Sequence, residues 1–429
     1  MDAARAGAPA PERRAGTHAA SLLLCALVVY VSLVPYPFIG GAELAGVPAP
    51  RLVPFGMGVI LFLLAIYGRR GEGGRGFGDV FLAAPLLWLV AAQAFGSIGS
   101  VEPMRSLSKA VFYFFTGIAF YLGACRLKPG ARAVLWSVAA ASCAAGAFST
   151  VEFFLGRTPL LREMYALDNP YYFFEALRGR SFGTLGHPVF TGGLFVLAAP
   201  AIFYLLDTER GKYLKAVLAV FLCVSLAGAL FTFSRGAIVS IAVSAFVFYR
   251  RALTKRRLAW LLVPVVIAIG ALAFSGRAGE TLGGRLSFSG ASQAGDLTHR
   301  LMAYELAGRV LADAPLFGMG VGNYRHLYGK YRVEEGDTRA VYATPDNMYL
   351  VTLAETGMLG LGLFVYILYT AYAALGARAR AGGTLQLAAL AMLAGFMVDM
   401  LFFDALYVEP LRAVFWTVLG TAFADGDSR

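Results

Sequence analysis

Residues 188–206 read PVFTGGLFVLAAPAIFYLL, and no residue in this stretch carries a charge. A helix needs about 20 consecutive apolar residues to cross the hydrocarbon core of a bilayer, so this stretch has the composition and length of a membrane span. Similar stretches recur along the 429 residues, of which 58% are hydrophobic and 15% charged, with a mean hydropathy of +0.66. This balance excludes a water-soluble protein of the same length and indicates a membrane protein.

The recurring apolar runs predict an all-α polytopic membrane protein, a single bundle over residues 1–429 with about 12 transmembrane helices. The predicted spans are residues 18–36, 52–67, 78–95, 107–124, 132–154, 188–206, 214–233, 236–249, 258–274, 347–375, 384–402 and 405–423.

The net charge of +11 would suggest nucleic acid in a soluble chain, but here the cations follow membrane topology. Lys and Arg concentrate in alternate connections, around Arg69, Arg126, Arg210, Arg250 and Arg378. The positive-inside rule places these connections in the cytoplasm. We therefore expect both termini to be cytoplasmic, the lipid bilayer to be a partner, and nucleic acid not to be one.

The four cysteines lie within or at the edge of apolar runs, and no Cys or His cluster has the spacing of metal ligands. We expect neither disulfides nor a metal site, and no cofactor.

Two long connections then face outward, residues 155–187 and residues 275–345. Long loops in compact proteins usually carry function. The second loop has a helical pattern over residues 297–313, which Asp296 can cap and Pro315 can stop.

Arg235 is an exception to the positive-inside pattern. It stands 15 residues before Arg250, or about 22 Å of helix, whereas the hydrocarbon core is about 30 Å thick. If Arg250 marks the inner surface, Arg235 lies below the outer headgroups, where arginine is costly unless it faces a cavity or an anion. The alternative is that Arg235 reaches outer-leaflet phosphates from a tilted helix.

The outer segment before residue 188 adds Arg178, Arg180 and His187. Guanidinium groups suit phosphate oxygens because they can donate two parallel hydrogen bonds. Equally, the arginines could contact anionic lipid headgroups, with His187 hydrogen-bonded near the start of the next helix.

Asp346 precedes the tenth predicted span, at its outer mouth, and is followed by Asn347. A carboxylate there could accept a proton from an acceptor hydroxyl. Alternatively, it is an acid in the first turn of a helix, where the helix dipole favours negative charge. Glu355, about two turns deeper, is expected to pair inside the bundle.

The glycines of residues 318–322 invite a phosphate-loop interpretation, but no strand–helix unit surrounds them, and a turn is the better account. Asp399, Asp404 and Glu409, near the last outer connection, could form a proton or cation path. These acids keep a transporter as an alternative.

Three blocks in this order resemble the bacterial O-antigen ligase and polymerase superfamily of polytopic glycan transferases. The blocks are residues 180–188 (RSFGTLGHP), residues 234–236 (SRG) at the head of a span, and the outer loop from residue 298 through residues 315–324 (PLFGMGVGNY). The loop ends in residues 346–350 (DNMYL) and 354–360 (AETGMLG). The resemblance covers residues 175–375.

This resemblance implies a metal-independent inverting glycosyltransferase with a C-type architecture, in the bacterial inner membrane, whose site faces the periplasm. Its donor would be a glycan on undecaprenyl diphosphate and its acceptor a glycan or lipid-linked sugar hydroxyl. Arg235 and Arg300 would hold the diphosphate, with Arg180 and His187 beside them. Two fixed cations would stabilise the departing diphosphate. Ligation and polymerisation stay open, and a flippase for lipid-linked sugars is the alternative from another class.

The family usually has histidine where this chain has Asp346, before Asn347. A carboxylate can perform the same proton transfer, so we expect Asp346 to be the catalytic base, with Asn347 and Glu355 in support. His326 is an alternative base, although a histidine on a loop surface is the more ordinary interpretation.

Overall fold

The computed structural model describes residues 11–34, 43–44, 47–67, 82–98, 100, 102–155, 180–250, 291–324 and 345–425. Within them the regular secondary structure is helical apart from one antiparallel pair of two-residue strands, β1 (Glu43–Leu44) and β2 (Val47–Pro48). The helices are α1 (Pro11–Leu33), α2 (Ala49–Tyr67), α3 (Ala83–Ile98), α4 (Pro103–Tyr113), the π-helix η2 (Phe114–Ile118), α5 (Ala119–Leu127), α6 (Ala131–Leu155), α9 (Pro188–Thr208), α10 (Lys212–Phe231), α11 (Arg235–Tyr249), α14 (Ala291–Asp313), α16 (Met348–Arg380), α17 (Thr384–Asp399), the 3-10 helix η4 (Ala405–Tyr407) and α18 (Glu409–Asp425).

All predicted spans except residues 258–274, which lie outside the described residues, overlap a helix. Five helices are long and apolar enough to cross a membrane: Pro103–Leu127, Ala131–Leu155, Pro188–Thr208, Lys212–Phe231 and Met348–Arg380. Shorter apolar helices cover His18–Leu33, Leu52–Tyr67, Arg235–Tyr249 and Thr384–Asp399. An all-helical, multi-pass membrane protein is therefore confirmed, but a count of about 12 spans is not.

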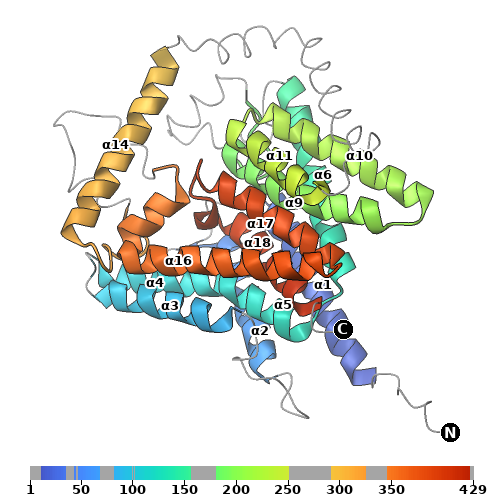
Figure 1. The fold of residues 1–429 in the computed structure, drawn as a ribbon, viewed down its shortest axis with the longest axis horizontal. Helices are drawn as coiled ribbons and strands as arrows, with labels where there is room; N and C mark the ends of the chain where they lie inside the picture. Colours follow the sequence, from blue (N-terminus) through green and yellow to red (C-terminus); the bar gives the residue numbers. More distant parts are fainter. Residues whose placement is uncertain are drawn as a thin grey trace.

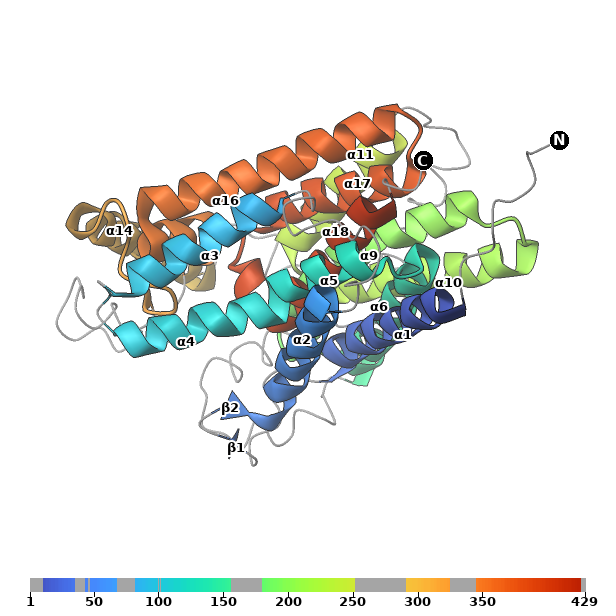
Figure 2. The same cartoon turned by 90° about the horizontal axis from the view of Figure 1, so that it is seen from below.

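Helix α9 lies inside the bundle, packed by α6, α10, α11 and α17 (Figure 1). The long helix α16 packs against α17 and α3, and α3 packs against α4 (Figure 2). Helix α14 stands at the edge of the molecule (Figure 1). Among the described helices, its main packing partner is α16.

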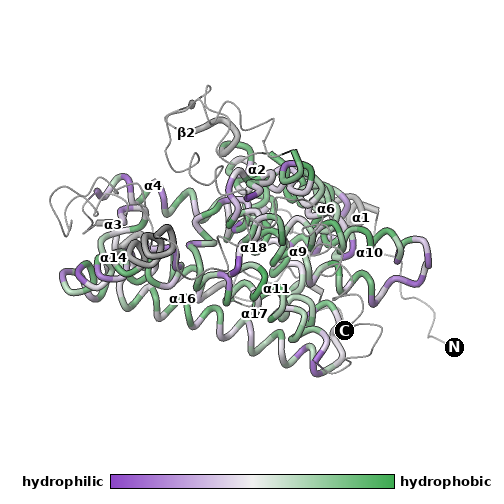
Figure 3. Tube along the Cα trace, turned by 90° about the horizontal axis from the view of Figure 1, so that it is seen from above, coloured by the Kyte–Doolittle hydropathy of each residue, from purple (hydrophilic) through white to green (hydrophobic). Residues whose placement is uncertain are grey.

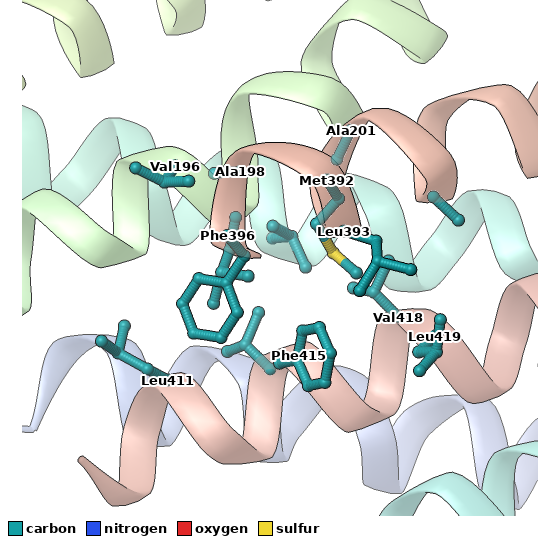
Figure 4. Packing of buried hydrophobic residues seen from close by; sticks show 14 of the residues in the cluster. Val196, Ala198, Ala201, Met392, Leu393, Phe396, Leu411, Phe415, Val418 and Leu419 are labelled. Carbon is teal, nitrogen blue, oxygen red and sulfur yellow. The ribbon is translucent and has the colours of Figure 1, made fainter. Parts of the chain in front are cut away.

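The centre of the bundle is apolar and tightly packed (Figure 4). Phe396 of α17 and Phe415 of α18 stack with their ring centroids 5.0 Å apart, and Val196 and Ala198 of α9 lie beside them. In lipid, where the hydrophobic effect between helices is weak, such close packing supplies much of the association energy.

Polar residues concentrate at the connections between helices (Figure 3). The connections around Arg126, Arg210 and Arg378, which carry predicted cytoplasmic cations, lie at one end of the described bundle, which we call the basic end. The contacts that join them are Gly130 N–H to Ser21 Oγ, Arg126 Nε to the carbonyl of Ala65, Arg132 to the Glu209 carboxylate, Arg378 Nη1 to the carbonyl of Phe423, and Gln386 Nε2 to the carbonyl of Ala422.

The opposite end carries residues 180–187, Arg235 and residues 345–348, and we call it the motif end. Thr184 donates from Oγ1 to the carbonyl of Ser32, near the end of α1, at 2.7 Å. The residues that resemble the glycan-transferase family therefore gather at the end of the bundle that is remote from its basic connections.

Helix α16 is two helices joined at Gly357, whose backbone is non-helical with φ 65° and ψ −169°. The predicted span 347–375 is therefore interrupted, and the long straight part begins after Gly357. Glu355 lies about two turns after the start of α16 and two residues before this bend, buried against the turn formed by residues 315–324.

Candidate functional site

The corner between α10 and α11 presents Arg235. The chain leaves α10 at Phe231, turns through Phe233 with φ 50°, and enters α11 with Arg235 as its first residue, exposed at the surface of the protein. Helix α11 has 15 residues, about 22 Å, and is shorter than the hydrocarbon core. The N-terminus of a helix carries partial positive charge, so the guanidinium group and the helix end favour an anion at the same place.

The segment 180–187 packs against this corner. Arg180 donates from Nε to the carbonyl of Thr232 at 2.8 Å, and the amide of Ser181 donates to the carbonyl of Phe231 at 3.0 Å. Thr232 lies three residues before Arg235. The structure thus places Arg180 on the corner that leads into Arg235, which stands 55 positions later in the sequence.

His187 caps α9. Its Nδ1 accepts the amide of Val189 at 3.3 Å, and its ring lies on Phe190 with centroids 4.4 Å apart. Burial, aided by the nearby charge of Arg180, lowers the pKa of His187 to about 3, so its ring is neutral at pH 7. The hydrogen bond near a helix start that the sequence offered as the alternative for His187 is present in the structure.

Asp346 has a left-handed backbone with φ 47° and is partly exposed. Asn347, the next residue, is the cap of α16, because its Oδ1 accepts the amides of Tyr349 at 3.0 Å and Leu350 at 3.2 Å. Asp346 therefore lies before the helix and not in its first turn. This corrects the interpretation of Asp346 as a first-turn acid, since Asn347 performs the capping.

The turn that follows α17 contacts both of these regions. The amide of Met348 donates to the carbonyl of Met400 at 2.9 Å. A Cβ atom on Gly236 would lie 2.8 Å from Phe402, so Phe402 packs directly on the first turn of α11. The start of α16, which follows Asp346, and the start of α11, which carries Arg235, are thus held by one short segment.

Glu355 has a structural partner. Its Oε1 accepts the amide of Tyr324 at 3.1 Å, and its carbonyl accepts the amide of Gly320 at 2.9 Å. The expected pairing of Glu355 inside the bundle is with the backbone of the glycine-rich segment. Residues 318–322 form an ordered turn on α16, as the sequence favoured.

Several predicted residues lie where the structure gives no side-chain description. Arg178 and His326 fall outside the described residues, and only the backbone of Arg300 is described, within α14. Helix α14 begins at Ala291, so Asp296 lies inside it and is not its cap, as had been expected. The helix ends at Asp313, two residues before Pro315.

Two buried charged residues inside the described helices escaped the sequence analysis. Glu152 of α6 is 4% exposed and accepts hydrogen bonds from residues 181–183. Arg412 of α18 is 3% exposed, donates from Nη2 to Thr116 of the π-helix at 2.6 Å, and lies over the ring of Tyr113. The available signal was an ionisable residue inside an apolar run, which is costly unless it is paired.

Asp399, Asp404 and Glu409 are all buried around the connection between α17 and α18. Asp399 lies against α9, since a Cβ atom on Gly193 would be 3.2 Å from its Oδ2. The structure thus gathers near the motif end the acids that the transporter alternative invoked.

Long apolar helices and polar connections between them define a multi-pass membrane protein. Residues 218–365 match the family model described as O-antigen ligase. A comparison with curated proteins finds no match. The family match confirms the resemblance to the O-antigen ligase superfamily and supports a membrane glycan transferase of the ligase or polymerase type. The matched residues include Arg235, Arg300 and Asp346.

Proposed function

We propose that the chain transfers a glycan from undecaprenyl diphosphate to a hydroxyl of an acceptor glycan or lipid-linked sugar, at the periplasmic face of the bacterial inner membrane. In this orientation the basic end faces the cytoplasm, as the positive-inside rule requires. Both termini are then cytoplasmic, and the motif end meets the donor.

The observation that carries the proposal is that Arg180 is bonded to the corner from which Arg235 begins α11, in a membrane protein that matches the O-antigen ligase model over residues 218–365. A diphosphate carries more than one charged oxygen group, and two guanidinium groups supply forked donors for it. Cations fixed at that place stabilise the charge that develops on the leaving diphosphate, and need no reorganisation during the reaction. Arg300 is proposed as a further ligand, while neutral His187 supports the corner through α9.

Asp346 is proposed as the base that accepts the proton of the acceptor hydroxyl. Its place before the Asn347 cap leaves it outside the hydrogen-bonded helix, and its partial exposure gives an acceptor access. The hydroxyl oxygen attacks the anomeric carbon, the bond from that carbon to the diphosphate oxygen breaks, and the proton passes to Asp346. Attack opposite the leaving group inverts the anomeric centre. We propose that this step is metal-independent.

The test is product formation by the purified protein in liposomes that contain undecaprenyl diphosphate glycan and candidate acceptors. Arg235→Ala is expected to lose activity by about 10²- to 10³-fold, the size seen when one preorganised donor is removed. Asp346→Ala should also be strongly impaired. Arg250→Ala is the matched control, because Arg250 follows the other end of the same helix, and it should retain activity.

The form of the product separates the remaining possibilities. Glycan transferred to an acceptor lipid means ligation, and a ladder of longer donor-linked chains means polymerisation. The buried acids Asp399, Asp404 and Glu409 favour transport as the second candidate. If labelled donor moves between leaflets and the wild type forms no product, the transferase proposal fails.

A further inference from the structure

Glu152 lies one turn before the end of α6, among apolar residues, and is 4% exposed. Burying an acid inside a membrane bundle costs desolvation free energy, and the hydrogen bonds that it accepts have to offset that cost. The next residue along the helix, Phe153, stacks on Phe231 of α10 with the ring centroids 4.5 Å apart.

One oxygen of Glu152 accepts three hydrogen bonds from consecutive residues. Its Oε2 accepts Ser181 Oγ at 2.8 Å, the amide of Phe182 at 3.0 Å and the amide of Gly183 at 2.7 Å. The chain between residues 181 and 183 is therefore wrapped around a single atom.

Gly183 makes this wrapping possible. Its φ is +65°, and a Cβ atom there would lie 2.4 Å from Thr191 Cγ2 and 2.8 Å from Ser149 Oγ. Any larger residue would be strained by its backbone conformation and by these contacts. The glycine of this block thus brings the backbone close to the Glu152 carboxylate.

The residue that precedes this wrapped segment is Arg180. On its other side the same segment is bonded to the α10–α11 corner, through Ser181 to Phe231 and through Arg180 to Thr232. Glu152 and the α10–α11 corner therefore contact the segment from two sides. The corner leads directly into Arg235.

We propose that Glu152 is a positioning residue that sets where the Arg180 guanidinium stands relative to Arg235, so that the two form a pre-arranged site for a diphosphate. This inference rests on the proposed function, because it assigns the two arginines to one anion. Glu152 acts through residues 181–183 and does not itself contact the donor.

The probe is undecaprenyl diphosphate without a glycan, and its binding is measured with the full-length protein in nanodiscs. Glu152→Ala should weaken binding about tenfold, because three donors lose their acceptor. Glu152→Gln should bind within about threefold of wild type, since a single amide oxygen can replace the single oxygen that accepts all three bonds. This difference identifies hydrogen-bonded positioning and not charge as the source of the effect.

Ser142→Ala is the matched control. Ser142 donates to Ser225 at 2.8 Å and joins the same two helices, α6 and α10, away from residues 181–183. Ser142→Ala should leave binding unchanged. A loss of binding in this variant would mean that loosened packing between α6 and α10 explains the effect of Glu152→Ala. Each variant is compared at equal folded fraction, measured by size-exclusion chromatography.

A double-mutant cycle shows whether Glu152 works through Arg180. If it does, Glu152→Ala combined with Arg180→Ala should bind no more weakly than Arg180→Ala alone. Full additivity, or wild-type binding by Glu152→Ala, would overturn the positioning role while the proposed function stands. Equal losses in Glu152→Gln and Glu152→Ala would also overturn it. Failure of the wild type to bind the probe would instead overturn the proposed diphosphate site and the inference with it.

Discussion

Residues 180–187 and residues 315–324 are two glycine-rich segments at the same end of the bundle, and each meets a buried glutamate. In the first segment, the Glu152 side chain accepts three hydrogen bonds. In the second, the Glu355 side chain accepts the amide of Tyr324, and backbone bonds make most of the junction. These bonds join Met319 to Ala354, Gly320 to Glu355, Met358 to Pro315 and Leu359 to Leu316.

The difference shows that two glycine-rich segments can be fixed in different ways, one by hydrogen bonds to a side chain and the other by hydrogen bonds between backbones. The first segment owes three of its hydrogen bonds to the side chain of Glu152, so a single substitution removes all three. The second depends on the path of the backbone at Gly357, where the helix bends and exposes amide and carbonyl groups that the turn then satisfies.

The largest effect is expected for Gly357→Ala. A Cβ atom there would lie 2.3 Å from the carbonyl oxygen of Leu316 and 2.6 Å from the amide nitrogen of Phe317, at φ +65°. Because backbone meets backbone, neither side can move cheaply, and we expect a loss of about 3 kcal/mol in the free energy of unfolding. Gly362→Ala is the control, since it has open space around it. Equal stability of the two variants in detergent denaturation would contradict the argument.

The next effect is a pH dependence that arises at His187, the cap in the first segment. His187 has a lowered pKa, about 3 against 6.5 when unfolded, so the unfolded chain binds a proton that the folded one excludes as pH falls below 6.5. The contribution of His187 to the free energy of unfolding is therefore fully present above pH 6.5. It declines as the pH falls, by roughly 2 kcal/mol at pH 5. The cap of the second region, Asn347, does not titrate.

The measurement is the unfolding midpoint at pH 7 and pH 5 for wild type and His187→Asn. The variant keeps a side-chain acceptor at the helix start but removes the titrating ring. Its midpoint should fall less than that of wild type on acidification. An identical fall in both proteins would assign the pH dependence to other groups.

Amide hydrogen exchange compares the two glutamates directly. In Glu152→Ala, the amides of Phe182 and Gly183 should exchange about tenfold faster, because their acceptor is gone. In Glu355→Ala, the amides of Met319 and Gly320 should change less, because they donate to backbone carbonyls. A larger change at 319–320 than at 182–183 would reverse the comparison.

The smallest effect is expected at the cap of α16. Asn347→Ala removes the acceptor of two amides and should cost about 1 kcal/mol in the free energy of unfolding, whereas Asn347→Asp keeps an acceptor and should cost little. Denaturation of the two variants measures the difference. An equal loss in both would mean that the amide group of Asn347 matters for another reason.

Much of the architecture was predictable because a membrane span can be recognised from a contiguous run of apolar residues. Every predicted span in the described part of the chain coincides with a helix, since a long apolar run in lipid must satisfy its own backbone hydrogen bonds. The predictions were wrong at positions that an apolar run does not determine. The bend at Gly357 and the early start of α14 depend on contacts with other segments.

For the candidate site, the sequence by itself determined which residue types and motifs are present and, through the basic connections, which segments share an end of the bundle. Only the tertiary structure decided that Arg180 lies on the corner that leads to Arg235, that Asn347 and not Asp346 caps α16, and that Glu152 holds residues 181–183. The physical reason is that apolar periodicity is a property of neighbouring residues. A hydrogen bond between distant segments is determined only when whole helices pack against one another.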